Sequence, residues 1–541
     1  MDDAGATADV FVKFIVMLRE RSIHNLNDLK EISTVSASAI RKMRSFHIII
    51  LVKNEIGRVN LYRLVSLSHL NYYSRWPRIP KSLLAKYREG LIVGSACEAG
   101  ELFRAVLEDR SPDEIARIVN FYDYLEIQPL GNNHFMIDSE KVPNVHNEED
   151  LKDLNRRIIA LCEQFNKPVC ATCDVHFLNP EDSLYRSIIM AGKGFSDADQ
   201  QPPLYLRTTE EMLAEFQYLG EEKAEEVVIT NTNLIADQIE RISPVSPDKC
   251  PPVIPDSDKT LRKICYERAH ELYGEKLPEI VEERLERELN SIIGNGFAVM
   301  YIIAQKLVWK SVADGYLVGS RGSVGSSFAA YTAGITEVNS LQAHYLCPNC
   351  KYVDFDSDYV KSFSGRSGCD MEDRNCPVCG HPLSKEGHDI PFETFLGFKG
   401  NKEPDIDLNF SGEYQSKAHA YTEVIFGHGQ TFRAGTIGTL AEKTAFGYAM
   451  HYFEEREIHK RPCELTRIAN GCVGVRRTTG QHPGGIIVVP LGMEIYTFTP
   501  VQHPANDMTT ETVTTHFDYH SIDHNLLKLD ILGHDDPTMI R

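Results

Sequence analysis

The chain has 541 residues, enough for about three or four domains, and its composition is that of an ordinary globular protein, 42% hydrophobic and 25% charged. No apolar run approaches the roughly 18 residues of a membrane span, and residues 1–20 have the pattern of an amphipathic helix, not of a signal peptide. The formal net charge of −20 argues against nucleic-acid binding by bulk electrostatics, although a local basic channel remains compatible with it. The 13 cysteines include two CxxC pairs, which favours metal and free thiols over disulfides. We therefore expect a cytoplasmic protein without a membrane partner.

The first half of the chain alternates predicted strands and helices. In order, we expect a helix at 5–20, a strand at 46–52, a helix ending near 70, a strand at 91–94, a helix at 111–122, a strand at 124–127, a helix at 148–165 and a strand at 169–172. This alternation predicts a parallel sheet or a barrel. Asp174 and His176 follow the last strand, at the end where barrel enzymes place their chemistry, and are candidate metal ligands. The alternative is a loop aspartate and a histidine with satisfied hydrogen bonds.

A proline-rich stretch at 242–256 predicts the clearest domain boundary. Apolar spacing then predicts a helix around 281–292 and another at about 298–313. The second helix leads into Gly319-Ser-Arg-Gly-Ser-Val-Gly-Ser-Ser327, where small residues let backbone N–H groups approach an anion and Arg321 supplies charge. The Walker lysine is missing, which disfavours a P-loop. A flexible Gly/Ser turn is the alternative.

Two cysteine pairs follow, Cys347-Pro-Asn-Cys350 and Cys376-Pro-Val-Cys379, with a polar, glycine-containing insert between them. The spacing is typical of a structural zinc site, in which four thiolates close a tetrahedral shell and leave no open position. Cys369 fits neither pair, so we expect it to be a free thiol.

The segment Pro404-Asp-Ile-Asp-Leu-Asn-Phe410 predicts a strand with Asp405 and Asp407 on one face and apolar side chains on the other. Two neighbouring carboxylates repel each other unless a cation lies between them, so the pattern favours Mg²⁺, with substrate phosphates completing its shell. For an isolated Asp-x-Asp, a solvated turn is the alternative. A strand at 526–532 carries a third acid, Asp530, and three carboxylates on neighbouring strands indicate a two-metal phosphoryl-transfer site.

Residues 431–439 lead to a helix expected from about residue 440. The later segment 476–485 is basic and glycine-rich, which suits contacts of Arg476 and Arg477 with a nucleic-acid backbone. A surface loop with two unrelated arginines is the alternative.

Taken together, these segments resemble the PolC-type alpha subunits of bacterial DNA polymerase III, family C. The resemblance is carried by 404–413 with 433–448, by Gly480-Gln-His-Pro-Gly-Gly-Ile-Ile-Val-Val-Pro490 and by 526–541, and it runs along the whole chain. It implies a palm similar to the nucleotidyltransferase (Pol β-like) superfamily, with a Gly-Ser pair, an Asp-x-Asp and a third aspartate. In this sequence the matching residues are Gly322 with Ser323, Asp405 with Asp407, and Asp530.

The resemblance also implies the fold class, an α/β multidomain chain whose PHP-type (β/α) barrel portion precedes an α+β palm with a zinc-knuckle insert and a small helical thumb. The implied order is a C-terminal helix of a 3′–5′ exonuclease insert (1–40), the second part of the PHP domain (41–245), the palm (246–440) with its zinc insert (345–385), the thumb (441–505) and the last palm strand (506–541). Asp3 would stand in place of the last metal-binding acid of the exonuclease. The early His-x-His-Thr motif of PHP domains is absent from this sequence.

The implied activity is DNA synthesis from dNTPs on a primer–template. Asp405 and Asp407 would hold two Mg²⁺ ions, and Asp530 would serve the ion at the primer 3′-OH. Gly322, Ser323 and Arg321 would bind the nucleotide phosphates. A structural Zn²⁺, a sliding clamp and other replisome subunits are further implied partners.

Most of the exonuclease acids and the family's fingers, clamp-binding and OB portions have no counterpart in these residues. We therefore expect an internal fragment that is inactive alone. Two other functions stay open: a PHP-type metal-dependent phosphoesterase, which would lack the His-x-His ligands, and a zinc-stabilised DNA-binding piece without catalysis.

Overall fold

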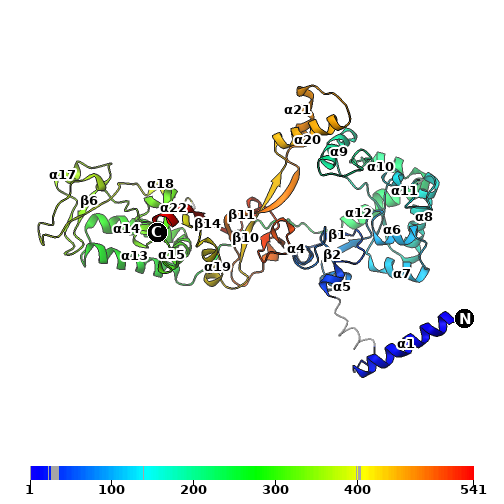
Figure 1. Cartoon of the computed structure of the whole chain (residues 1–541), viewed down its shortest axis with the longest axis horizontal. Coiled ribbons are helices and arrows are strands. Elements are labelled where there is room, and N and C mark those ends of the chain that lie inside the picture. Colours follow the sequence, from blue (N-terminus) through cyan, green and yellow to red (C-terminus); the bar gives the residue numbers. More distant parts are fainter. Residues whose placement is uncertain are drawn as a thin grey trace. The chain divides into compact units, whose positions relative to one another are not determined.

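The computed structural model describes residues 2–21, 23–25, 36–137, 139–397, 399, 402 and 404–541 (Figure 1). Two compact units make up the chain, residues 1–241 and 242–541. The division coincides with the start of the proline-rich stretch that the sequence marks as a boundary. The side chain of Asp3 lies outside the described residues.

In the first unit, the described residues form helices and short strands. The helices are α1 (Asp2–Glu20), α3 (Ala37–Ile40), α4 (Glu55–Leu70), α5 (Lys81–Lys86), α6 (Glu101–Leu107), α7 (Pro112–Phe121), α8 (Glu148–Phe165), α9 (Ser183–Gly192), α10 (Thr209–Glu215), α11 (Glu221–Glu225) and α12 (Asn231–Ala236). The strands are β1 (Ile49–Val52), β2 (Leu91–Gly94), β3 (Leu125–Ile127) and β4 (Val169–Ala171). Helix α7 begins where predicted, because Ser111 Oγ accepts a hydrogen bond from Glu114 N and Pro112 occupies the first helical position.

The strands of this unit do not form the uniformly parallel sheet that the alternation predicts. β3 and β4 are parallel, but β1 and β2 are antiparallel, with Ile49 opposite Gly94. Two helices, α4 and α5, connect β1 to β2. β2 therefore starts beside the end of β1, where Lys53 N donates a hydrogen bond to Gly90 O at 2.8 Å. Within the part of the chain that the structure describes, the strand pairs do not close into a barrel.

The second unit is built on a seven-stranded mixed sheet in the order β12–β13–β10–β11–β14–β9–β5. Its strands are β5 (Val318–Arg321), β9 (Asp407–Ser411), β10 (Thr431–Thr439), β11 (Arg476–Val488), β12 (Val501–Gln502), β13 (Thr514–Thr515) and β14 (Leu527–His534). A separate three-stranded sheet, β7–β6–β8, is formed by β6 (His344–Leu346), β7 (Val353–Asp354) and β8 (Ser384–Glu386).

The described residues of the second unit form ten α-helices. They are α13 (Ser257–Tyr273), α14 (Glu279–Gly294), α15 (Ala298–Ala313), α16 (Phe328–Thr332), α17 (Asp358–Lys361), α18 (Glu393–Leu396), α19 (Gln415–Phe426), α20 (Glu442–Glu455), α21 (Pro462–Asn470) and α22 (Asp535–Ile540). Of these, α13, α14, α15 and α19 cover one face of the large sheet, where their side chains pack with Leu408, Phe410, Ile486 and Ile531 in one apolar core. The opposite polar face of β9 and β14 is therefore free to carry chemistry.

No single described helix is long and apolar enough to cross a membrane. One bent pair, α14 with α15, passes the length and composition test when the two are taken together, with a bend of 110° between them. Many residues of both helices are buried in the core of the second unit.

One predicted strand begins later than expected, and two segments without a predicted secondary structure form long strands. The strand expected at 404–410 begins only at Asp407, where pairing with β5 starts opposite Arg321, so Asp405 precedes the strand. Residues 431–439 form strand β10, and 476–488 form strand β11, which pairs antiparallel with β10. The region expected as a helical thumb thus has helices only at α20 and α21, between two long strands. Thr, Gly and Arg adopt an extended conformation here because the ladder supplies their backbone hydrogen bonds.

Candidate active site

Three neighbouring strands bring the predicted acidic residues to one face of the large sheet. β9 pairs in parallel with β14, with Leu408 opposite Ile531, so the residues one position earlier, Asp407 and Asp530, are neighbours. On the other side of β9, Arg321 of β5 lies opposite Asp407. Directly opposed residues share a face of the sheet. The fold therefore gathers two acids from distant parts of the sequence beside one arginine.

Cations already lie against these carboxylates. Arg321 Nη2 lies 3.6 Å from Asp407 Oδ2, and Lys528 Nζ lies 3.0 Å from Asp530 Oδ2. Burial raises the pKa of Asp407, and the charges of Asp405 and Asp530 raise it further, while Arg321 partly offsets them. The three acids thus interact through their charges, and an additional cation among them would relieve the repulsion.

Oxygen atoms without hydrogen-bond partners mark the same face. Asp530 Oδ1 and Asn409 Oδ1 are buried and accept no hydrogen bond within the described residues. Such a buried acceptor is costly unless something else pairs with it. Carboxylate and amide oxygens are the donors that Mg²⁺ and similar hard cations take. The donor set therefore fits a divalent metal. The oxygen atoms of Asp405, Asp407 and Asp530 do not all lie within 4.8 Å of one another, unlike the ligand atoms of the cysteine group described below.

The Gly-Ser segment lies against the acidic face. Gly322 has a φ of +73°, a conformation that L side chains rarely adopt, and a β-carbon there would lie 3.8 Å from Asp407 Oδ2. Gly322 is exposed and Ser323 is half-buried. The segment predicted to bind phosphate is thus next to the segment predicted to bind metal. Behind them, Asp405 and Asp530 line a cavity of about 50 Å³ together with Met300 and Ile303 of α15.

His482 of β11 also contacts this face and was not among the residues singled out from the sequence. Its Nδ1 accepts hydrogen bonds from Gly485 N at 2.7 Å and Gly484 N at 3.2 Å, so a neutral ring carries its proton on Nε2. The same Nδ1 lies 3.7 Å from Asp530 Oδ1. Asn409 was missed as well, although it continues the alternation of Asp405 and Asp407 along the chain. Their positions in the sequence were the available signals. His482 lies inside a glycine-rich segment, and Asn409 is two residues after Asp407.

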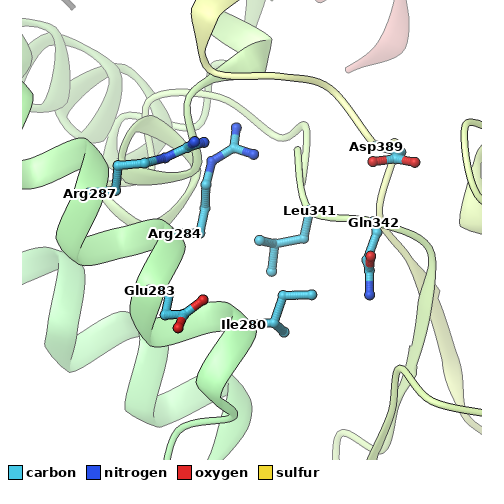
Figure 2. Close-up of a pocket in the computed structure, with 7 residues that line it drawn as sticks. All are labelled: Ile280, Glu283, Arg284, Arg287, Leu341, Gln342 and Asp389. Carbon is cyan, nitrogen blue, oxygen red and sulfur yellow. The ribbon is translucent and has the colours of Figure 1, made fainter.

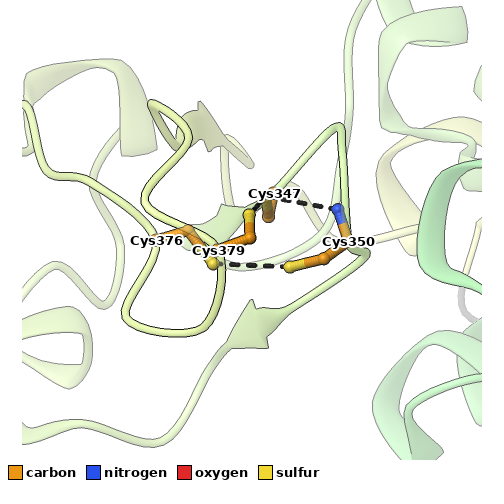
Figure 3. Close-up of side chains that lie close together, drawn as sticks. All are labelled: Cys347, Cys350, Cys376 and Cys379. Carbon is orange, nitrogen blue, oxygen red and sulfur yellow. Dashed lines mark hydrogen bonds between the residues drawn. The ribbon is translucent and has the colours of Figure 1, made fainter.

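The four predicted cysteine ligands converge (Figure 3). The sulfur atoms of Cys347, Cys350, Cys376 and Cys379 lie within 4.8 Å of one another. Cys347 Sγ is 3.5 Å from Cys379 Sγ, and Cys350 Sγ is 3.4 Å from Cys376 Sγ. Four sulfurs about 2.3 Å from a tetrahedral zinc ion would stand about 3.8 Å apart.

The surroundings of these sulfurs favour thiolate at Cys379 but not at Cys350, where a backbone hydrogen bond from Tyr352 is outweighed by burial and the neighbouring cysteines, which raise the pKa to about 12. Cys350 N and Val378 N donate to the sulfurs of Cys347 and Cys376 at 3.5 and 3.4 Å. The backbone of His381 and the side chain of Asn349 lower the pKa of Cys379 to about 6. Cys369 is an exposed free cysteine, as predicted.

In the first unit, Asp174 follows β4 as predicted, but its close neighbours are Cys97 and Glu98, with ligand atoms within 4.8 Å of one another. His176 is outside this group, and its Nδ1 lies 2.8 Å from the carbonyl oxygen of Asp174. Burial, with Glu98 nearby, raises the pKa of the Cys97 thiol to about 12. His47 Nδ1 lies 3.3 Å from Cys97 Sγ. Asp174 and His176 themselves lie close together, with His176 Nδ1 3.8 Å from Asp174 Oδ1, but His176 is not part of the group formed by Cys97, Glu98 and Asp174.

Arg476 and Arg477 are exposed at the start of β11. On the same strand, Gly485 pairs with Asp530. At about 3.3 Å per residue, the intervening length of strand separates the two arginines from the acidic face by roughly 25–30 Å. They do not belong to the acidic site.

Acidic side chains beside a small-residue segment, with oxygen atoms available to a cation, are typical of proteins that act on nucleotides or nucleic acids. The family model described as the bacterial DNA polymerase III alpha NTPase domain matches residues 259–460 and 448–533. A PHP domain model matches residues 9–130. The chain belongs to the bacterial DNA polymerase III alpha family.

Curated relatives named DNA polymerase III PolC-type are similar over the whole chain. The protein of Clostridium perfringens is 57% identical over 542 residues, that of Caldanaerobacter subterraneus subsp. tengcongensis 57% over 541, and that of Bacillus subtilis 52% over 542. In each case the match covers 100% of this chain but only 37 or 38% of the relative. The chain thus spans little more than a third of the length of these proteins.

Proposed function

We propose that this chain carries the nucleotidyl-transfer site of a PolC-type replicative DNA polymerase. The observation that carries the proposal is the shared face on which Asp407, Asp530 and Arg321 meet beside Gly322. The carboxylates on this face can bind a divalent metal ion, and the adjoining arginine and small residues can bind phosphate groups. Family membership adds the reaction class, the transfer of a nucleotidyl group from a dNTP to a primer 3′-OH.

Asp405 and Asp407 would hold both Mg²⁺ ions, and Asp530 would hold the ion on the primer side. When bound, the ions supply charge neutralisation and a more acidic 3′-hydroxyl. The protein's own part is positioning. Lys528 lies 3.0 Å from Asp530 and 4.3 Å from the Tyr519 ring centroid, which limits the directions open to the Asp530 carboxylate.

The nucleotide phosphates would bind at Gly322, Ser323 and Arg321. The missing side chain at Gly322 lets a phosphate oxygen approach the backbone, the Ser323 hydroxyl can donate, and Arg321 offers a charged fork. The Arg321–Asp407 contact is partly exposed, so exchanging it for a phosphate contact costs little.

The remaining parts have supporting roles in this proposal. Residues 246–440 and 506–541 would form a nucleotidyltransferase-like palm, 345–385 a zinc-knuckle insert, and 441–505 a thumb. Residues 1–40 would end an exonuclease insert, and 41–245 would be the second part of a PHP domain. The PHP model matches from residue 9, upstream of the boundary at 41. Asp174 and His176 would be remnants of a PHP metal site.

The four cysteines would bind one structural Zn²⁺, and Arg476 and Arg477 would contact the DNA backbone. The proposed partners are primer–template DNA and dNTPs and, in the longer protein, a sliding clamp and other replisome subunits in the cytoplasm.

The test is Mg²⁺-dependent incorporation of dNTPs into primed DNA, with hydrolysis of a generic phosphoester as the contrasting assay. The clustering of Cys97, Glu98 and Asp174 favours a phosphoesterase as the second candidate. Asp407→Asn should remove incorporation and leave any phosphoester hydrolysis intact, while Asp174→Asn should do the opposite. Incorporation that survives Asp407→Asn in a chain extended to the relatives' length would overturn the proposal.

A further inference from the structure

A buried acid–base pair on α14 lies outside the acidic face. The Glu288 side chain is 0% exposed, and Arg284, one turn earlier, is 14% exposed and forms an ion pair with it through Nε. A buried carboxylate is costly unless its charge is paired and its lone pairs are occupied. Both conditions are met here, by atoms of the segment that follows β5.

Glu288 holds the beginning of α16. Its Oε2 accepts hydrogen bonds from Ser327 Oγ and Ala329 N, both at 2.9 Å, and its Oε1 accepts one from Phe328 N at 3.1 Å. Ser327 Oγ in turn accepts from Ala330 N at 3.1 Å. The first N–H groups of α16 are therefore occupied by the protein's own side chains and are not available to an external anion. An anion approaching this segment can meet only its earlier part, around Gly322 and Ser323.

Arg284 holds the same segment from the other side. Its Nη2 donates to Ser326 O at 2.8 Å and to Ile390 O at 3.0 Å, and Ser326 Oγ donates to Ser323 O at 2.5 Å. A continuous series of contacts thus runs from α14 to Ser323. Figure 2 shows the Arg284 guanidinium extending from α14 at the edge of a cavity of about 280 Å³, which is also lined by Leu341.

We propose that Glu288 and Arg284 are positioning residues for the nucleotide-phosphate site at Gly322 and Ser323. The inference rests on the proposed function and adds residues that belong to neither the metal nor the phosphate set. Gly322 already lies against Asp407, so a shift of this segment changes the distance between bound phosphate and the acids. A misplacement of about 1 Å can cost on the order of a hundredfold in rate.

The test uses Glu288→Gln, which keeps the shape of the side chain and removes its charge. The matched control is Arg287→Gln on the same helix, because Arg287 is 53% exposed and pairs with Glu393 at 3.3 Å, away from α16. Two quantities are measured on the chain extended to the length of the curated relatives: the affinity for a Mg²⁺–dNTP, and backbone hydrogen exchange of 322–330 without nucleotide. Glu288→Gln should weaken nucleotide binding by about tenfold or more, as supporting residues around a site typically do. It should also speed exchange in that segment, while exchange in 345–385 stays as in the wild type.

A second variant separates positioning from general destabilisation. Ser323→Ala should weaken nucleotide binding by itself, and the combination with Glu288→Gln should be clearly less than additive, because both changes act on one element. Wild-type binding and exchange in Glu288→Gln would overturn the inference alone. A wild-type protein of the relatives' length that binds no Mg²⁺–dNTP would overturn the proposed function and the inference with it.

Discussion

Arg321 faces Asp407 across the β5–β9 pair, with its Nη2 3.6 Å from Asp407 Oδ2. Arg321 is 53% exposed, so solvent screening limits the ion pair to about 0–1 kcal/mol. The same two residues would be needed separately when substrate is bound, the carboxylate for a cation and the guanidinium for a phosphate. Because their contact is weak, it holds both side chains near the site and can still be replaced. The carboxylate can then bind a cation, and the guanidinium a phosphate.

The first prediction concerns Asp407→Asn. Incorporation by the polymerase that contains this chain should fall by about a hundredfold or more, in line with the loss of one preorganised electrostatic contact. Without divalent metal, the variant should melt about 1–3 °C higher, because a repelled carboxylate is removed. The folded-state pKa of Asp407 is raised, so its ionisation costs stability at pH values above that pKa, and the gain should fade as the pH falls towards 4.

Thermal melting in EDTA at several pH values, together with primer extension, checks this prediction. Asp153→Asn, at an exposed position on α8, is the control and should change neither quantity. A lower melting temperature for Asp407→Asn in EDTA would show that the carboxylate is stabilised by its surroundings instead.

The second prediction is one zinc ion per chain at Cys347, Cys350, Cys376 and Cys379 in protein purified under reducing conditions. Cys350→Ser should release the metal and loosen 345–385, while Mg²⁺ binding at the aspartates persists. Metal content by atomic absorption and local hydrogen exchange measure both effects. Cys369→Ser is the control, since Cys369 is exposed and outside the set. Full zinc content in Cys350→Ser would rule out this ligand assignment.

The third prediction is a pH dependence of stability in the second unit. His344 is fully buried, and burial lowers its pKa to about 4 from an ordinary value of 6.5. The neutral ring is satisfied, with Nδ1 2.8 Å from Gln342 O and Nε2 3.1 Å from Tyr273 Oη. Between those pH values the unfolded chain binds a proton that the folded chain does not. Stability should therefore fall by up to about 3 kcal/mol as the pH drops from 6.5 to 4.

Urea unfolding between pH 7.5 and 4.5 measures this loss. His344→Gln should flatten the slope in that window, whatever its effect at neutral pH. His428→Gln should leave the slope unchanged, because the His428 side chain is 98% exposed. Equal slopes for the wild type and His344→Gln would mean that other groups dominate the acid sensitivity.

The fourth prediction concerns DNA contact. The double change Arg476→Gln and Arg477→Gln should weaken primer–template binding regardless of sequence and reduce the slope of log K against log salt by about 1.8, since each phosphate contact contributes about 0.9. Binding titrations from low to moderate salt measure the slope. Arg366→Gln on the proposed zinc insert is the matched control. An unchanged slope would remove the two arginines from the DNA interface.

The fifth prediction is that the 541-residue chain extends primers at least about a hundredfold more slowly than a version extended to the length of the curated relatives. More than half of each relative lies outside the matching region. Polymerase catalysis is mostly positioning, and a missing wall of the nucleotide pocket costs at least as much as a displacement of about 1 Å. Primer extension with Mg²⁺ and four dNTPs compares the two proteins. Comparable, Asp407-dependent rates would show that these residues form a complete site.

Local patterns in the sequence were sufficient wherever the controlling interaction is local. The cap at Ser111 predicts the start of α7, and the spacing of two CxxC pairs predicts four converging sulfurs. Each of these predictions depends either on contacts between residues a few positions apart or on a metal-ligand geometry that the spacing of the cysteines implies.

The tertiary structure decided what depends on which strands pair. Only the sheet order places Asp530 beside Asp407, reverses β2 against β1, and turns the basic segment after Arg476 into a long strand. Glu288 is the clearest case, because a charged residue on an amphipathic helix is ordinarily expected at the surface. It is buried because the first N–H groups of α16 and the Arg284 guanidinium converge on its carboxylate, and residues distant in sequence bring those donors there.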